Sequence, residues 1–376
     1  MVKPASDIPK KASGTLGYLV YFIFAFITMV FVFDLDVSLN SAPYSTPTFG
    51  VGECNEHLVV LVHGLLGNSA DLDYLGQRLR QQGCTVLQSK SNNYVRSLQG
   101  IKAASQRLVE EIGDTQLNYP KLKTISFVGN SLGGLFSRYA LNLMSREGKS
   151  HLFFASDNIS PLEPGIFMTI ATPHIGVLDD LYLEDKLQHL LGKPKITLPT
   201  FAKKLVGKIM GTSGSDCFLD DADSITESLL YKMSIEEEYL EPLRWFEKRR
   251  LYANLDLDFM VSLNTAAFLE KDTVNKLRDE NIHFANDKGK ARIITRIFTD
   301  QKSSEDAAVI NASSYDDEKE VIYARMRQRL NAVGWEKVVV YFPSYLPLAL
   351  AHNKIASKGW FIQGRFVMDE AASYIT

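Results

Sequence analysis

The sequence predicts an α/β protein with a mostly parallel central sheet flanked by helices. Short apolar runs rich in β-branched residues, which are typical of strands covered on both faces, alternate with longer amphipathic stretches. Such alternation implies parallel strands joined by right-handed crossover connections. The composition agrees, because 45% of the 376 residues are hydrophobic and 23% are charged, as in globular chains with a sizeable core.

The first expected strand is His57–Val62, a continuous apolar run that leads into the glycine-containing segment HGLLGN. The helix expected next, Ala70–Gln82, repeats leucines on one face. The other expected elements, in chain order, are a strand at Thr85–Ser89, a helix at Leu98–Ile112, a strand at Thr124–Val128, a helix after Gly134, and strands at Ile166–Ala171, Arg250–Leu255 and Lys337–Phe342.

Charge and cysteine content exclude several classes of function. Lys and Arg number 41 against 44 Asp and Glu, so the chain offers no overall basic field for nucleic acid. Cys54, Cys84 and Cys217 lie far apart without a CxxC pair, which predicts neither a disulfide framework nor a zinc site of paired thiolates. The odd cysteine count slightly favours a reducing compartment.

The N-terminal segment differs from the rest of the chain. Ala12–Phe33 is uncharged and long enough to cross a hydrocarbon layer of about 30 Å as a helix. Lysines precede it and aspartates follow it, so we expect a single-pass anchor with a cytosolic N-terminus, in an endomembrane such as the endoplasmic reticulum or a lipid droplet. A cleaved signal peptide and a buried or surface-lying helix are the alternatives. We therefore divide the chain into an anchor and linker (1–50) and a globular domain (51–376).

The strongest chemical signal is Gly129-x-Ser131-x-Gly133. An apolar strand precedes this motif and a helix follows it, which is the setting of a nucleophilic serine on a sharp strand-to-helix turn in α/β-hydrolases. Glycines at these positions leave room for a strained backbone and for close neighbours. The alternative is a glycine-rich turn with an incidental serine. A dinucleotide-binding fold is excluded, because the first strand is not followed by G-x-G-x-x-G.

A serine hydroxyl needs a base, and the base needs an orienting acid, which follow the serine in the order acid then histidine. Only His283 and His352 leave room for an acid after the sheet has continued past Ser131. His352 comes after the expected strand Lys337–Phe342, and this position favours it as the base. Asp256 and Asp258 both follow the expected strand Arg250–Leu255, and spacing alone does not separate them.

Two backbone N–H groups are candidates for the oxyanion hole. Leu65 follows the first strand and Leu132 follows the serine, so their amides can stabilise the anion of a tetrahedral intermediate together. We interpret His63 as a structural residue that braces this loop. The chemistry needs no metal and no organic cofactor.

Six motifs resemble the DUF676-type serine esterases, a family of eukaryotic α/β-hydrolase lipases. They are VHGLLGN, FVGNSLGG, IATPHIGV, FLDD…LLYKMS, YANLDLDFMVSLNTA and LALAHNKI, in this order between Glu56 and Lys358. The resemblance implies Ser131 as nucleophile and His352 as base. It favours Asp258 as the acid, four residues after Asn254. The family commonly has a proline after the Val of the acid motif, whereas this chain has Ser262, which predicts a looser acid loop.

The family resemblance also implies a lipid substrate, namely acyl esters of monoacylglycerols, phospholipids or related glycerolipids. An insertion at about 177–247 falls where such folds carry a cap or lid. We expect partners of two kinds, a lipid substrate and a membrane or lipid-droplet surface, without an obligate protein partner. Two alternatives stay open: an acyltransferase or protein thioesterase with the same three residues, and a membrane-tethered interaction protein with an inactive hydrolase fold.

Overall fold

A computed structural model describes residues 56–145, 151–154, 159–177, 210–258, 260–281, 290–302, 317–343 and 350–376. The expected anchor and linker at 1–50 lie outside these residues. Within them, no helix combines the length and the apolar character needed to cross a bilayer.

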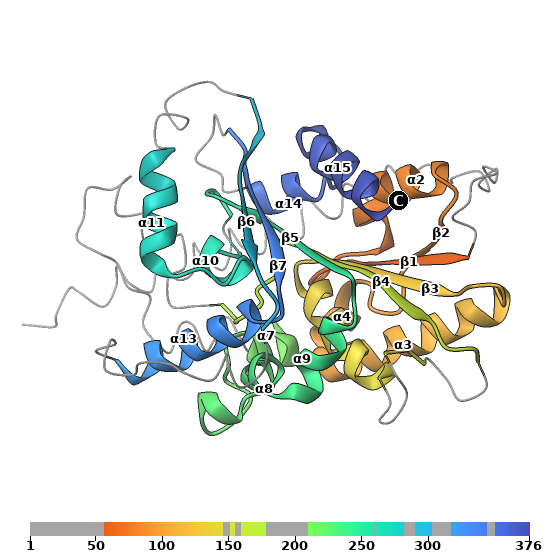
Figure 1. Cartoon of the computed structure of the whole chain (residues 1–376), viewed down its shortest axis with the longest axis horizontal. Helices are drawn as coiled ribbons and strands as arrows, with labels where there is room; N and C mark the ends of the chain where they lie inside the picture. The colour runs from red at the N-terminus through yellow and green to blue at the C-terminus, as the bar shows by residue number, and fades with distance from the viewer. Residues whose placement is uncertain are drawn as a thin grey trace, which may run out of the picture.

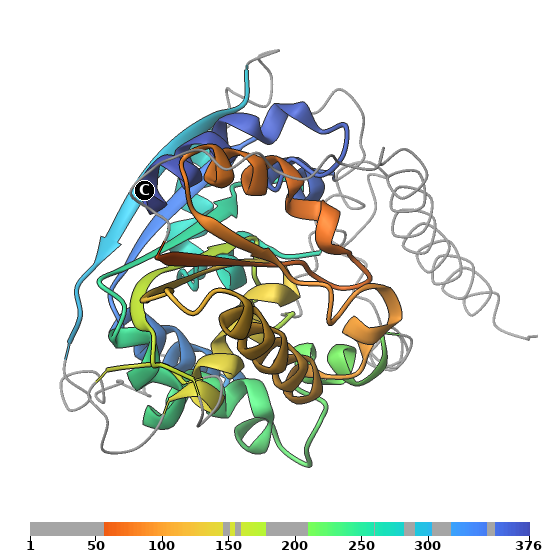
Figure 2. The ribbon, with the colours of Figure 1, turned by 90° about the vertical axis from the view of Figure 1, so that its right-hand side faces the viewer.

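Seven strands of the described residues form one sheet in which every pair of neighbours is parallel except β6 and β7 (Figure 1). The sheet twists strongly between β1 and β6 (Figure 2). In spatial order the strands are β2 (Thr85–Gln88), β1 (His57–Val62), β3 (Thr124–Asn130), β4 (Glu163–Ile170), β5 (Lys248–Asn254), β7 (Trp335–Tyr341) and β6 (Arg292–Thr299).

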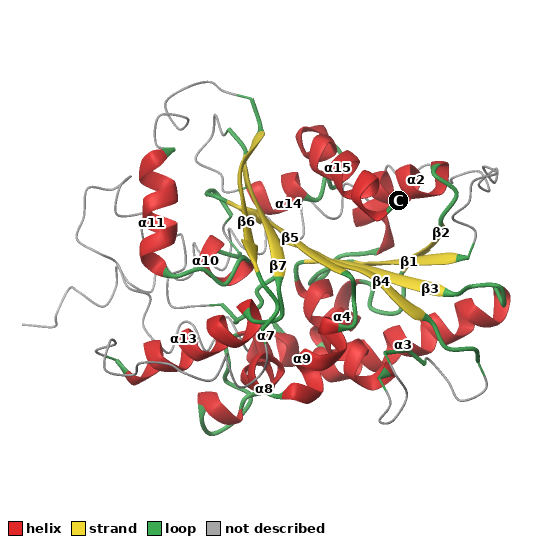
Figure 3. Ribbon diagram, in the orientation of Figure 1, coloured by secondary structure: helices red, strands yellow, loops and turns green. Residues whose placement is uncertain are grey.

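Helices cover both faces of this sheet (Figure 3). One face carries α2 (Asp73–Gln81), α14 (Ala351–Ile355) and α15 (Arg365–Ile375). The other face carries α3 (Ile101–Asn118), α4 (Leu132–Met144), α8 (Leu229–Ile235), α9 (Glu237–Arg244), α10 (Leu263–Ala266), α11 (Lys271–Glu280) and α13 (Glu318–Asn331). Because successive side chains of a strand point to opposite faces, Leu58 and Val60 join one core while Val59 and Leu61 join the other. This explains why β1 is apolar throughout.

The expected strands are confirmed, and β1 has the bounds that the sequence predicts. Some elements differ from expectation. The single helix expected at Ala70–Gln82 is a short 3-10 helix η1 (Ser69–Leu72) followed by α2, and the helix expected after Gly134 begins at Leu132. The helix expected at Leu98–Ile112 begins at Ile101, because Gly100 has a φ of +95° that no helix contains. Strand β6 was not expected, because its sequence RIITRIFT mixes arginines and threonines with apolar residues, as an edge strand with an exposed side can.

Part of the expected lid-like insertion belongs to the core of the domain. Residues 178–209 lie outside the described residues. After them come α7 (Gly211–Cys217), a short 3-10 helix η3 (Ile225–Glu227), α8 and α9. The side chains of Leu230, Met233, Leu240 and Leu243 are fully buried in the core that also contains α3 and α4. Residues 229–246 therefore pack on the sheet rather than forming a separate cap.

The order of the strands predicts where a ligand would bind. The chain runs from β1 to β2 on one side and then to β3 on the other, so the connections leave the carboxyl ends of β1 and β3 in opposite directions. In open parallel sheets, ligands bind in the crevice that forms at such a switch point. Ser131 follows β3, and the HGLLGN segment follows β1.

The cysteines correct one inference from the sequence. Cys84 is disulfide-bonded, whereas Cys217 is a free thiol whose pKa is raised by burial. Separation along the chain does not exclude a disulfide, because a fold can bring together cysteines that are distant in the sequence.

We expect the denatured, unreduced chain to expose one thiol to a chromogenic disulfide reagent, and all three cysteines after reduction. Cys217→Ser should bring the unreduced value to zero while leaving two thiols after reduction. Three reactive thiols before reduction would contradict the disulfide.

Candidate active site

Ser131 lies on a strained turn between β3 and α4. Its φ is 55°, a left-handed conformation that costs a non-glycine residue about 1–3 kcal/mol and is found mainly at functional sites. A Cβ on Gly133 would lie 2.1 Å from Val62 O, and a Cβ on Gly129 would lie 2.4 Å from Gly134 Cα. The two glycines of the motif are therefore required sterically.

Backbone and side-chain hydrogen bonds hold the turn from β4. Ser131 N–H donates to Ile170 O at 2.8 Å. Thr172 Oγ–H donates to Ser131 O at 2.8 Å, and a Cβ on Gly134 would lie 2.2 Å from Thr172 Oγ1. Thr172 is not among the site residues that the sequence predicts. Its only signal was its place directly after a strand, in the motif IATPHIGV.

The segment after β1 lies against Ser131. A Cβ on Gly64 would lie 2.5 Å from Ser131 Cβ and 3.0 Å from Ser131 Oγ, so only glycine fits there. Leu65 follows Gly64, and Leu132 begins α4. The N–H groups of Leu65 and Leu132 donate to no acceptor among the described residues, which leaves both available to an oxyanion.

His63 braces this segment, as the sequence indicates. Its Nδ1–H donates to Gly64 O at 2.9 Å. Burial lowers the pKa of His63, so the ring stays neutral at physiological pH. Gly67 N–H also donates to Gly64 O, at 3.2 Å. Because a trans peptide directs N–H opposite to C=O, these two bonds fix the direction of Leu65 N–H.

Asp258 and His352 form a buried pair. His352 Nδ1–H donates to Asp258 Oδ2 at 3.0 Å, and both residues are 3% exposed. Asn254 Nδ2–H donates to the same oxygen at 2.7 Å. Met260 and Val261 N–H donate to Oδ1 at 3.0 and 2.9 Å. The loop after β5 that carries Asp258, called the acid loop below, is thus held by three hydrogen-bond donors besides His352. The presence of Ser262 in place of a proline had predicted a looser loop.

The geometry separates the two aspartates that the sequence left open. Asp256 is half-buried and lies 4.0 Å from Arg278 Nε, away from His352. Leu257 between them has a φ of 62°, and its carbonyl accepts a hydrogen bond from Ala351 N–H at 3.1 Å. This bond joins the acid loop to the helix that carries His352. The other candidate base, His283, lies outside the described residues.

Ser131 and the Asp258–His352 pair follow the carboxyl ends of strands in the same sheet. Ser131 comes directly after β3, Asp258 after β5 and His352 after β7. Ser131 is 4% exposed. Among the contacts of the described residues, none joins Ser131 Oγ to His352, so this last contact of a catalytic triad stays a prediction.

Comparison with known families agrees with this architecture. Residues 53–271 match the family model described as "Putative serine esterase (DUF676)". The chain belongs to this family. It is 28% identical over 239 residues to "Putative lipase C4A8.10" of Schizosaccharomyces pombe, a match that covers 60% of this chain and 27% of the relative. It is 31% identical over 225 residues to "Putative lipase ROG1" of Saccharomyces cerevisiae, covering 58% and 29% of the two chains.

The chain therefore spans less than a third of the length of these two curated relatives. Among solved structures, it resembles the mature lipase BlEst2 of Bacillus licheniformis with a TM-score of 0.36 and 14% identity, over 61% of this chain and 77% of that one. It resembles lipase B of Aspergillus fumigatus with a TM-score of 0.36 and 13% identity, over 61% and 46% of the two chains.

A second histidine near the turn at Ser131 is structural. His174 Nε2 lies 2.9 Å from Thr169 Oγ1, and Arg138 donates to the His174 carbonyl at 2.9 Å. Burial, together with the positive charges of Arg138 and Lys337, lowers the pKa of His174 well below its usual value. A neutral ring with these partners holds the segment after β4 in place.

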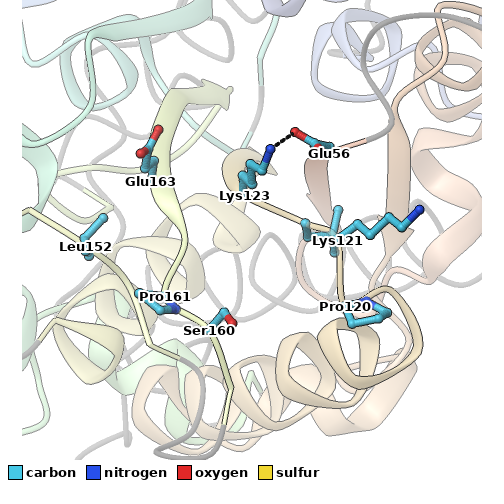
Figure 4. Close-up of a pocket in the computed structure, with 9 residues that line it drawn as sticks. Glu56, Pro120, Lys121, Lys123, Leu152, Ser160, Pro161 and Glu163 are labelled. Carbon is cyan, nitrogen blue, oxygen red and sulfur yellow. Dashed lines mark ion pairs between the residues drawn. The ribbon is translucent and has the colours of Figure 1, made fainter.

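The surface hollow in Figure 4 is separate from these residues. It has a volume of about 590 Å³ and lies at the amino ends of β1, β3 and β4, lined in part by Glu56, Lys123 and Glu163 (Figure 4). Ser131 lies beyond the opposite ends of these strands. No group of three or more His, Cys, Asp or Glu in the described part of the chain is arranged to hold a metal ion.

We expect Asp258→Asn to lower kcat for ester hydrolysis by about 10⁴, because the amide no longer selects the tautomer in which His352 accepts a proton on Nε2. The matched control is Asp256→Asn, which should stay within about twofold of wild type because Asp256 contacts Arg278 instead. Initial rates on a soluble ester measure both variants. A larger loss in Asp256→Asn would move the acid to that residue.

Proposed function

We propose that this serine esterase hydrolyses acyl esters of lipids through a Ser131–His352–Asp258 triad and an acyl-enzyme. The observation that carries the proposal is the buried Asp258–His352 pair. It lies at the carboxyl ends of the parallel strands, where Ser131 also lies on a strained turn between glycines. Such a pair provides a base of defined orientation, and such a turn presents a hydroxyl to it.

The arrangement supports a two-step reaction. In the first step, His352 Nε2 takes the hydroxyl proton as Ser131 Oγ attacks the ester carbonyl, and Leu65 and Leu132 N–H stabilise the oxyanion. The imidazolium, stabilised by Asp258, then protonates the leaving alcohol, and the acyl group stays on Ser131. In the second step, His352 removes a proton from water, the hydroxide attacks the acyl-enzyme, and the fatty acid leaves as Ser131 regains its proton.

An exposed apolar surface supports a lipid substrate presented at a membrane. Tyr94 and Val95 are exposed on the 3-10 helix η2 (Tyr94–Leu98), and Trp360 and Ile362 are exposed between α14 and α15. Tyr94 N–H donates to Gly67 O at 2.8 Å. This bond joins the first segment to the loop beside Ser131. The second segment reaches the end of the same loop, because Lys358 Nζ lies 2.7 Å from Asp71.

The charge of these two segments fits an anionic surface. Residues 89–109 and 350–368 contain no Asp or Glu, in a chain whose net charge is −3, and their exposed cations are Lys90, Arg96, Lys102 and Arg365. Aromatic and aliphatic side chains flanked by cations are typical of segments that insert into the interfacial region of anionic bilayers. We therefore define Tyr94, Val95, Trp360 and Ile362 as the apolar rim, with an anionic bilayer as its partner.

The proposal extends to the location of the enzyme. The N-terminal segment Ala12–Phe33 would anchor it in an endomembrane, with the hydrolase domain on the non-cytosolic side. The charge asymmetry of the segment supports this orientation. The disulfide at Cys84 supports it as well, because disulfides persist in oxidising compartments such as the lumen of the endoplasmic reticulum.

The first test is labelling of Ser131 by a fluorophosphonate in mixed micelles. We expect wild-type protein to be labelled and to hydrolyse a monoacylglycerol, whereas Ser131→Ala should show neither reaction while keeping its fold. The loss should be at least about 10³-fold, because no other group replaces the nucleophile. Equal turnover in the two proteins, or an unlabelled and inactive wild type, would overturn the proposed function.

The second test concerns the apolar rim. We expect Trp360→Ala with Ile362→Ala to reduce hydrolysis of a monoacylglycerol in vesicles containing phosphatidylserine by at least about thirtyfold, because immersion of each large apolar side chain is worth roughly 1–3 kcal/mol. Hydrolysis of soluble p-nitrophenyl butyrate should stay within about twofold.

Phe298→Ala is the matched control for the rim. Phe298 is 68% exposed, against 58% for Trp360, but it pairs with Glu336 at the amino end of β7. Phe298 thus lies near the amino end of β7, whereas Ser131 lies at the carboxyl end of β3. Equal losses on vesicles in the rim variant and in Phe298→Ala would contradict the membrane-facing assignment.

A further inference from the structure

The segment 63–68 after β1, which contains Leu65, is called the oxyanion loop here. Two large residues, one in this loop and one beside it, adopt left-handed backbone conformations. Leu66 has a φ of 53° and Tyr94 has a φ of 54°. For bulky side chains this conformation is uncommon and persists only where surrounding contacts enforce it. Leu66 directly follows Leu65, whose N–H is the proposed oxyanion donor, so the contacts that enforce the conformation of Leu66 bear on that donor.

Reciprocal hydrogen bonds join the two strained positions. Leu66 N–H donates to Ser97 Oγ at 2.7 Å, and Tyr94 N–H donates to Gly67 O at 2.8 Å. Ser97 Oγ–H donates to Tyr94 O at 2.6 Å. Because the single hydroxyl hydrogen is used for Tyr94, the oxygen of Ser97 acts only as acceptor toward Leu66. The hydroxyl therefore connects the oxyanion loop to η2.

Helix α7 holds Ser97 in turn. Ser213 Oγ–H donates to Ser97 O at 2.6 Å, and Gly100 N–H donates to Ser213 Oγ at 2.9 Å. Asp216 accepts a hydrogen bond from Ile101 N–H at 2.7 Å, which caps α3. Ser97 and Ser213 are both fully buried, so water does not compete for these bonds.

We propose that Ser97 is a positioning residue for the oxyanion hole, supported by Ser213 from α7. Its hydroxyl fixes Leu66, and η2 fixes Gly67, whose N–H donates to Gly64 O. The Gly64–Leu65 peptide is thereby held with Leu65 N–H directed away from Gly64 O. The inference rests on the proposed function, since it concerns a donor to the oxyanion of that reaction.

The test compares Ser97→Ala with Ser105→Ala in the full chain. Ser105 is also a fully buried serine, and its Oγ–H lies 2.8 Å from Ile101 O and from Phe136 O on α3 and α4, away from the loop. We expect Ser97→Ala to lower kcat about tenfold with KM within about twofold, because a misdirected donor weakens the transition state more than the bound ester. Ser105→Ala should keep the wild-type kcat.

Affinity for a boronic acid tests the oxyanion hole separately from the stability of the fold. The boronate adduct of Ser131 places a tetrahedral oxygen in the oxyanion hole, so its affinity should fall about tenfold in Ser97→Ala, in parallel with kcat. Equal kcat and equal boronate affinity in Ser97→Ala and Ser105→Ala would overturn the inference while leaving the proposed function intact. A wild-type chain that hydrolyses no ester would overturn both.

Ser213→Ala keeps the inference testable if Ser97→Ala fails to fold. We expect kcat to fall about threefold in Ser213→Ala, because the oxyanion loop is then held by a less restrained Ser97. The double variant should resemble Ser97→Ala alone, since both changes act through one chain of hydrogen bonds. An unchanged kcat in Ser213→Ala, or losses that multiply in the double variant, would overturn the role of α7.

Discussion

The left-handed turn at Ser131 is the constraint on which the rest of the site depends. The turn is possible only because Gly129 and Gly133 allow α4 to start within van der Waals contact of the ends of β1 and β3. The same proximity requires glycine at position 64, where the loop after β1 meets the side chain of Ser131. Once these contacts exist, the amides that follow β1 and β3 lie beside Ser131. One strained residue therefore sets the place of both the proposed nucleophile and the proposed oxyanion.

The half of the site that holds Asp258 and His352 is built differently. No close backbone approach creates it, and it depends on a buried carboxylate that receives four donors from three segments. Removing the carboxylate would leave Asn254 and two backbone amides without their acceptor, so the acid loop and the histidine are coupled through one group. Helix α14 has only five residues, too few to form a stable helix alone. The hydrogen bond from Ala351 N–H to Leu257 O joins it to the acid loop.

These two modes of construction explain how much the sequence could predict. Strand β1 and the turn at Ser131 were predictable, because a short apolar run and closely spaced glycines determine the structure of the residues that contain them. The choice between Asp256 and Asp258 rested on family resemblance, since both follow β5 and only the left-handed Leu257 sets which one faces His352. Strand β6 was missed because an edge strand has no uniform apolar pattern. The disulfide at Cys84 was missed because spacing along the chain does not show which cysteines the fold brings together.

The residues that sequence analysis missed around the site share a side-chain type. Thr172 donates its hydroxyl to a backbone carbonyl of the nucleophile turn. Ser97 and Ser213 each donate to one backbone carbonyl and accept from one backbone amide, and so help to join segments that are distant in the sequence. A hydroxyl combines donor and acceptor on one atom in a small volume, whereas a carboxylate or an ammonium group supplies one kind only and is costly to bury. Buried connections between loops therefore favour serine and threonine. Because these residues are also common on surfaces and in turns, their positions in the sequence carry no signal, and only the fold reveals which of them hold the site together.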